Sequence, residues 1–173
     1  MMMNFKALQE GYLLAERLGK TEAAANFLAK INQVRREQPE SIAPRDEARF
    51  ELTRIERMLH QAPPFGFQEV QAALRSLVSR LPAAVKEPAY HVYMAASLGQ
   101  QYAFEKQSGR TEAELAPLVE QAIATIRQAR YAGQTDWLHY LADPARGAAD
   151  PDRNDDLVEI AKLPAVRAEL GLG

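Results

Sequence analysis

Residues 118–129 read LVEQAIATIRQA, and this stretch decides the class of fold that we expect. Its apolar residues recur at steps of three and four, which places their side chains on one face of an α-helix. They are Val119, Ala122, Ile123, Ile126 and Ala129. Polar residues fill most positions between them, and Gly133 then ends the pattern as a helix-terminating glycine does. The stretch therefore predicts an amphipathic helix with one buried face.

Five further apolar stripes of helical spacing precede this helix, starting at Phe5, Ala24, Phe50, Val70 and Tyr90. Consecutive stripes are separated by proline or glycine, at Gly19, Pro39, Ala62–Gly66, Pro82 and Gly109. No run of residues alternates between apolar and polar as a strand does, so the chain is predicted to be all-α. Because short connectors favour antiparallel neighbours, we expect three helical hairpins and a C-terminal cap of short helices. Their approximate ranges are 3–38, 44–82 and 88–132 for the hairpins and 135–171 for the cap.

Three positions in these helices carry specific expectations. Pro117 lies inside the helix that Thr111 and Glu114 would cap, so we expect a kink there or a later start of the helix. Asp136 is expected to cap the short helix that follows Gly133. Pro164 interrupts the last apolar stripe, which predicts two short helical turns instead of one helix.

The composition excludes several classes of protein. The 173 residues carry 21 lysines and arginines against 23 aspartates and glutamates, and no cysteine. The net charge of −2 offers no basic surface to nucleic acid, and no apolar run approaches the roughly 20 residues that span a bilayer. Residues 1–18 lack the apolar core of a signal peptide. We therefore expect one cytoplasmic domain, residues 1–173, that binds neither nucleic acid nor a membrane.

Residues 24–31 and 122–129 present apolar residues at steps of four and three, mostly small at the ends of each set, and Gly19 precedes the first of these segments. Residues 70–77 repeat the spacing with bulkier side chains. This pattern resembles the second helix of tetratricopeptide repeats. The copies lie further apart than the roughly 34 residues of the standard repeat. The resemblance implies antiparallel hairpins stacked as an irregular repeat domain.

The C-terminal half carries a second set of matching segments. They are Tyr90–Leu98, Leu118–Ala129, Ala132-Gly133, Asp136, Leu141, Asp143-Pro144, Asp156-Leu157, Ile160, Pro164, Val166 and Leu170. Together they resemble the terminal repeat in the helical tails of bacterial eukaryotic-like serine/threonine kinases. The Gly-rich loop, Val-Ala-Ile-Lys and His-Arg-Asp motifs of the kinase domain occur nowhere in the chain. The resemblance therefore implies a bacterial protein-binding repeat and not a phosphotransferase.

The sequence shows no catalytic or metal-binding motif. The three histidines, His60, His91 and His139, do not have metal-ligand spacing. Residues 150–156 alternate as calcium ligands do, at Asp150, Asp152, Asn154 and Asp156, but the glycine and glutamate of an EF-hand loop are missing. We interpret this segment as a solvated loop. We therefore expect no enzymatic activity, no cofactor and no metal.

Two groups of residues are candidates for binding a partner. Tyr90 and Tyr93 belong to an aromatic-rich segment, and tyrosine is common at binding surfaces; the alternative is that these rings fill the core. In tetratricopeptide folds the first helix of each pair lines the inner groove. The resemblance therefore implies Lys6, Gln9 and Arg17 as further candidates.

These observations favour a non-catalytic adaptor module that binds a protein or peptide in a helical groove. Two alternatives stay open. One is a compact helical bundle with an enzymatic or ligand-binding core, which a closed cavity with converging carboxylates or histidines would indicate. The other is a structural subunit of a larger complex, which an exposed apolar patch would indicate. Self-association of the chain is compatible with each of them.

Overall fold

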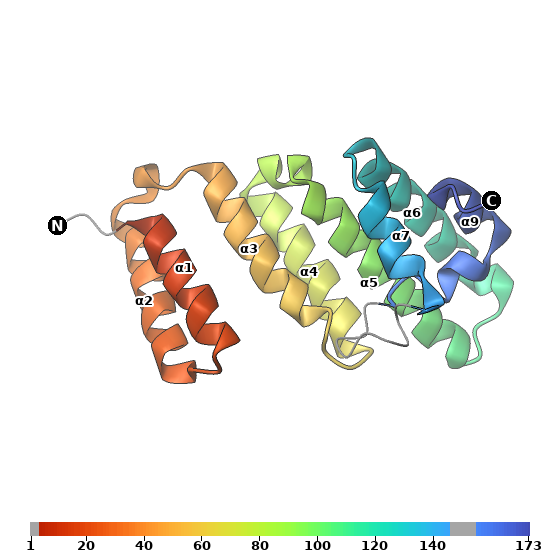
Figure 1. Ribbon diagram of the computed structural model, residues 1–173, viewed down its shortest axis with the longest axis horizontal. Coiled ribbons are helices and arrows are strands. Elements are labelled where there is room, and N and C mark those ends of the chain that lie inside the picture. Colours follow the sequence, from red (N-terminus) through yellow and green to blue (C-terminus); the bar gives the residue numbers. More distant parts are fainter. Residues whose placement is uncertain (1–3, 146–154) are drawn as a thin grey trace. The chain divides into compact units, whose positions relative to one another are not determined.

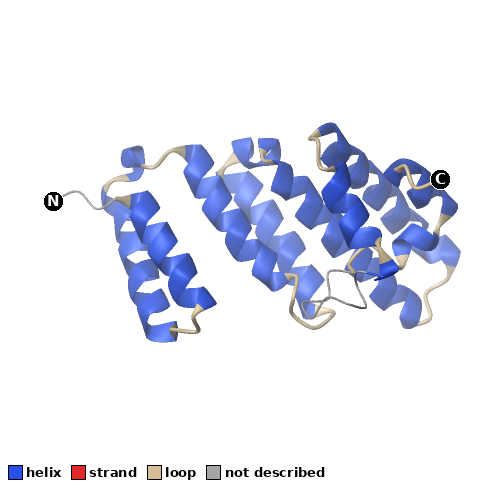
Figure 2. Cartoon of the chain, in the orientation of Figure 1, coloured by secondary structure: helices blue, strands red, loops and turns tan. Residues whose placement is uncertain are grey.

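The computed structural model describes residues 4–145 and 155–173, and every regular element in these two ranges is helical (Figure 2). The all-α prediction is thereby confirmed for this part of the chain. Three short 3-10 turns accompany eight α-helices in it. The α-helices are α1 (Phe5–Arg17), α2 (Thr21–Glu37), α3 (Pro44–Met58), α4 (Phe65–Arg80), α5 (Pro88–Gln107), α6 (Glu112–Tyr131), α7 (Thr135–Ala142) and α9 (Pro164–Leu170).

The chain divides into two compact units, Met1–Phe50 and Glu51–Gly173. The boundary lies inside α3, and so within the second of the three predicted hairpins. We describe each unit by itself.

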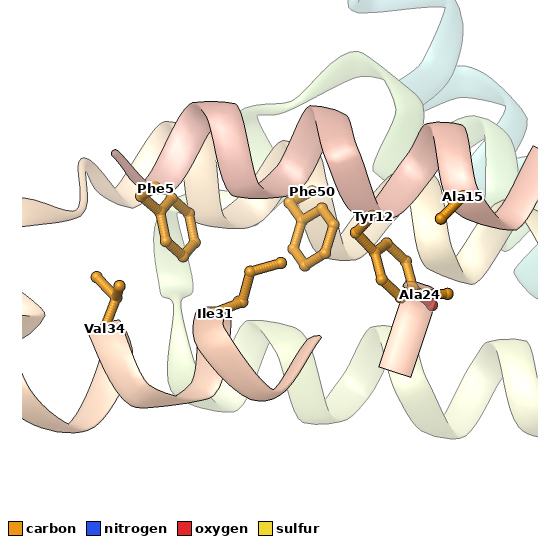
Figure 3. Packing of buried hydrophobic residues seen from close by; sticks show 7 residues of the cluster. All are labelled: Phe5, Tyr12, Ala15, Ala24, Ile31, Val34 and Phe50. Atoms are coloured by element: carbon orange, nitrogen blue, oxygen red, sulfur yellow. The ribbon is translucent and has the colours of Figure 1, made fainter. Parts of the chain in front are cut away.

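In the first unit, α1 and α2 form an antiparallel hairpin (Figure 1). Gly19 lies in the connection with φ of +67°, a conformation that L side chains rarely adopt, and so explains why α1 ends where the sequence predicted. The two helices and the start of α3 enclose a small apolar core (Figure 3). Its buried residues are Phe5, Tyr12, Ala15, Ala24, Ile31, Val34 and Phe50.

Phe50 is the aromatic centre of this core. Its ring makes edge contacts with Phe5 and Tyr12, at centroid distances of 6.4 and 5.5 Å (Figure 3). Next to it, Arg35 of α2 forms an ion pair of 2.5 Å with Glu47 of α3, and its guanidinium lies 5.8 Å from the centroid of the Phe50 ring. The start of α3 is therefore held against α2 by an ion pair as well as by apolar contacts.

In the second unit, α5 contacts α4, α6 and α7 (Figure 1). Residues 92–99 of α5 are all buried, so this helix has no solvent-facing side along that length. A helix surrounded in this way carries apolar residues all round instead of in one stripe. The positive-φ glycines Gly109 and Gly133 end α5 and α6, as the sequence predicted.

Three helix starts can be compared with the sequence predictions, and those of α7 and α4 were placed incorrectly. α6 begins at Glu112, because Thr111 and Glu114 form a complete capping box, and it continues past Pro117, so the later start is wrong. α7 begins at Thr135, which puts Asp136 in the first turn and not at the cap. α4 begins at Phe65, so Gly66 belongs to the helix.

Gly66 is needed in α4 because the chain passes close to it. A Cβ at this position would collide with the main-chain oxygen of Gln61. The glycine was interpreted from sequence as a helix breaker, whereas its role is a close approach of backbone.

The C-terminal cap has the two short turns predicted around Pro164, a 3-10 turn at Ile160–Lys162 and α9. Polar contacts hold α9 to its neighbours. Nε2 of His139 donates to the Leu170 carbonyl at 2.5 Å, and the Arg127 guanidinium bonds both carboxylate oxygens of Glu169, at 3.2 and 3.1 Å. The cap is thus fixed to α6 and α7.

Candidate functional site

Two of the five predicted binding residues lie in the interior. Gln9 of α1 is buried, and its Nε2 donates to the main-chain oxygen of Asp46 at 3.3 Å. Tyr93 of α5 is 6% exposed, its hydroxyl donates to Glu56 at 3.1 Å, and its ring makes an edge contact of 5.5 Å with Trp137. Burial and the neighbouring Glu56 raise the pKa of the Tyr93 hydroxyl. Both side chains therefore have structural partners within their own unit.

The other three predicted residues are accessible to different degrees. Lys6 and Arg17 are exposed on α1 of the first unit. Tyr90 is half-buried on α5 of the second unit, where its ring contacts that of His91 edge-on at 5.2 Å. Tyr90 and Tyr93 share one helix, but only Tyr90 presents part of its ring to solvent.

The second unit contains a cleft that none of these five residues lines. Its volume is about 740 Å³, within the range of roughly 300–1,000 Å³ that is typical of ligand pockets. Three parts of the chain form it: the turn after α3, the C-terminal half of α5 and the segment that begins at Asp155. The lining residues are Leu59, His60, Gln61, Ala62, Pro63, Gln100, Ala103, Phe104, Gln107, Asp155, Asp156, Val158 and Glu159. We call this hollow the α5 cleft.

Gln100 connects all three parts of the α5 cleft. Its Nε2 donates to the carbonyl of Leu59 at 2.8 Å and to Oδ1 of Asp156 at 2.6 Å. Because both partners are acceptors, the nitrogen of the amide must face them, which fixes the position of Oε1. Oε1 is buried and accepts no hydrogen bond from any described residue.

Asp156 reaches α5 through its main chain as well. A Cβ on Gly99 would collide with the Asp156 carbonyl oxygen, so only glycine lets the segment lie this close to the helix. The amide of the next residue, Leu157, donates to the Leu141 carbonyl at 3.1 Å. The segment is therefore held against both α5 and α7.

The carboxylate of Asp156 has an unusual affinity for protons. Its pKa is raised to about 6, first because burial disfavours the charged form and second because Asp155 is a neighbouring carboxylate. The Gln100 hydrogen bond and His60 act in the opposite direction and limit the shift. A carboxyl with such a pKa in a cleft can exchange a proton near neutral pH.

Apolar side chains also line the α5 cleft. Phe104 lies against Phe67 of α4, with the ring centroids 5.8 Å apart, and Ala103 and Pro63 complete this apolar wall. Glu159 is one of the polar lining residues, and Lys106 and Lys162 donate to it at 3.1 and 2.7 Å. The α5 cleft therefore offers both apolar contact area and hydrogen-bond acceptors.

Sequence reasoning missed this site, although one signal for it was present. Gly99 and Gln100 interrupt the apolar centre of α5, and a glycine within a helix indicates a close approach of another segment. The partners, Leu59 and Asp156, lie far away in the chain, and only folding brings them to α5.

The other sequence-based hypotheses are tested to different extents. Asp150, Asp152 and Asn154, three of the alternating residues of the expected solvated loop, lie outside the described residues. In residues 4–145 and 155–173, no group of three or more His, Asp or Glu side chains is placed to hold a metal ion. Within the same ranges, no helix combines the length and the apolar character that crossing a bilayer requires.

The described residues are helical in all their regular elements, and the α5 cleft of the second unit combines polar and apolar lining residues. Comparisons with known protein families, with curated protein sequences and with solved structures give no match to this chain. The function must therefore be argued from the cleft itself.

Proposed function

We propose that this chain is a non-catalytic binding module whose α5 cleft takes a short segment of a partner protein. The cleft is the observation that carries the proposal, because it combines ligand-sized volume with an apolar wall and a polar rim. Its open edge is formed by exposed residues, among them His60, Gln107 and Asp155. An extended peptide can enter such a hollow from solvent.

The resemblance to tetratricopeptide repeats, and to the helical tails of bacterial kinases, supports a binding role in this proposal. The site we propose differs from the groove that the resemblance implied, since it lies at the turn after α3 and not along α1. The lack of cysteine fits a reducing compartment, and we assign the binding function to the cytoplasm.

A cleft-filling substitution tests the proposal. Ala103 lines the α5 cleft and is only half-buried, so Ala103→Trp should fill the hollow while α5 remains folded. We expect peptides selected from a random display library on the intact chain to lose at least about tenfold in affinity for Ala103→Trp, as measured by fluorescence polarisation.

Ala124→Trp is the matched control, because Ala124 is exposed on α6 and does not line the cleft. This variant should bind the selected peptides like the parent chain, and circular dichroism should show the same helix content for both variants. Failure to select any peptide, or equal affinity for the parent and Ala103→Trp, would refute the binding function.

A second candidate function is a small-molecule site with acid–base chemistry. The raised pKa of Asp156 in a cleft that His60 also lines favours it. Retention of a stoichiometric small molecule by the purified chain, together with loss of that molecule in Ala103→Trp, would favour this function over peptide binding.

A further inference from the structure

The acidic side chains of the α5 cleft differ in what neutralises them. Glu159 is bonded by the ammonium groups of Lys106 and Lys162. Asp155 and Asp156 have no lysine or arginine partner among the described residues, although His60 lines the same cleft and acts to lower the pKa of Asp156. The Asp155–Asp156 side of the cleft therefore lacks the lysine pairing that neutralises Glu159.

The Asp156 carboxylate can accept more hydrogen bonds than the described residues donate to it. Asp156 receives one hydrogen bond, from Nε2 of Gln100 to Oδ1. An ionised carboxylate accepts hydrogen bonds at both of its oxygens, so donors of a ligand can satisfy the acceptor sites that remain. A ligand rich in N–H groups is the chemistry that matches such a surface.

The apolar wall adds a second requirement. Ala103 and Phe104 offer hydrocarbon surface in the same cleft as the two carboxylates. Lysine and arginine side chains combine an aliphatic stem with a cationic end, so they match both parts of the cleft at once. A neutral polar side chain would match only the rim, and an apolar one only the wall.

We propose that the α5 cleft selects a lysine or arginine side chain of the bound peptide, with the aliphatic stem on Ala103 and Phe104 and the cation at Asp155 and Asp156. This inference rests on the proposed function and names the chemistry of its ligand. The contact at Asp156 is a charge-assisted hydrogen bond to a half-buried carboxylate, which is stronger than a hydrogen bond between neutral groups.

Peptide display on the intact chain gives the first test. Peptides recovered from a random library should be enriched in arginine or lysine at one position. One arginine peptide is then compared with its citrulline analogue, which keeps the shape of the side chain and removes its charge. We expect about tenfold weaker binding of the citrulline peptide at pH 7.5.

Two variants of the chain connect this effect to the cleft. Asp156→Asn keeps an acceptor but removes the charge. Asp155→Asn does the same at an exposed residue, where the substitution should not disturb folding, so it serves as the test if Asp156→Asn folds poorly. Each should lower the affinity for the arginine peptide and leave the citrulline peptide unchanged. Glu120→Gln, which removes an exposed carboxylate on α6, should change neither.

The outcomes separate this inference from the proposed function. Peptides that need an open cleft but show no basic enrichment, or that bind equally well as citrulline analogues, overturn the inference and leave the binding function standing. Recovery of no peptide refutes both. We expect the parent chain to bind the arginine peptide more weakly at pH 5 than at pH 7.5, because protonation removes the charge of Asp156. In Asp156→Asn the same change of pH should weaken binding less, and this difference between the two proteins supports the inference.

Discussion

At the scale of single residues, Asp156 shows how the position of one carboxyl couples stability to pH. Burial raises its pKa to about 6, above its value in an unfolded chain. The folded state therefore binds a proton more tightly than the unfolded state. Stability from this group is fully present at pH values below the unfolded pKa and is lost as the pH rises through 6.

We expect the Asp156→Asn variant to remove this dependence. We compare the free energy of unfolding of the variant with that of the parent chain at each pH. The difference in favour of the variant should be larger at pH 7 than at pH 4 by on the order of 2 kcal/mol, because the asparagine never becomes charged. Urea unfolding of both proteins at the two pH values measures this difference. Parallel stability profiles for the two proteins would show that Asp156 titrates normally.

At the scale of elements, the start of α6 depends on the capping box of Thr111. The Thr111 hydroxyl accepts from the Glu114 amide at 3.2 Å, and the Glu114 carboxylate accepts from the Thr111 amide at 2.8 Å. These contacts lower the pKa of Glu114, which shows that they favour its charged form. The capping box holds the first turn although Pro117 removes one interior hydrogen bond of the helix.

Thr111→Ala should therefore destabilise the chain by about 1 kcal/mol, the usual cost of a lost N-cap. Thr111→Ser keeps the hydroxyl and should cost much less. Thermal unfolding followed by circular dichroism compares the two variants. Equal loss in both would mean that the methyl group of Thr111, and not its cap, stabilises α6.

At the scale of the whole molecule, the chain has two compact units with separate apolar cores. Phe50 is buried in the first unit with Phe5 and Tyr12. The first unit has the smaller core, so loss of one large ring should affect it strongly.

We expect Phe50→Ala to destabilise the first unit by about 3–5 kcal/mol. Hydrogen exchange followed by mass spectrometry should then show faster exchange in α1 and α2, with α5 and α6 close to the parent rates. A uniform increase over all helices would indicate that the two units unfold as one.

The sequence by itself determined the helical class, the order of the helices and most of their ends. These features depend on local rules: apolar spacing, capping residues and glycines such as Gly19 and Gly133 that adopt positive φ. The same local rules misplaced Gly66 and left open whether Tyr93 lies at a binding surface or in the core, because spacing alone does not say which face of a helix another segment covers. Gln9 was a candidate only through the tetratricopeptide resemblance, and it is buried.

Only the tertiary structure decided where the α5 cleft lies and what it presents. Gln100, Leu59 and Asp156 come from three distant parts of the chain, and no periodicity relates them. Their meeting depends on the close approach at Gly99, and the proton affinity of Asp156 depends on the burial that this approach produces. Burial and long-range contact are properties of the packed chain, which is why the candidate site appears only after folding.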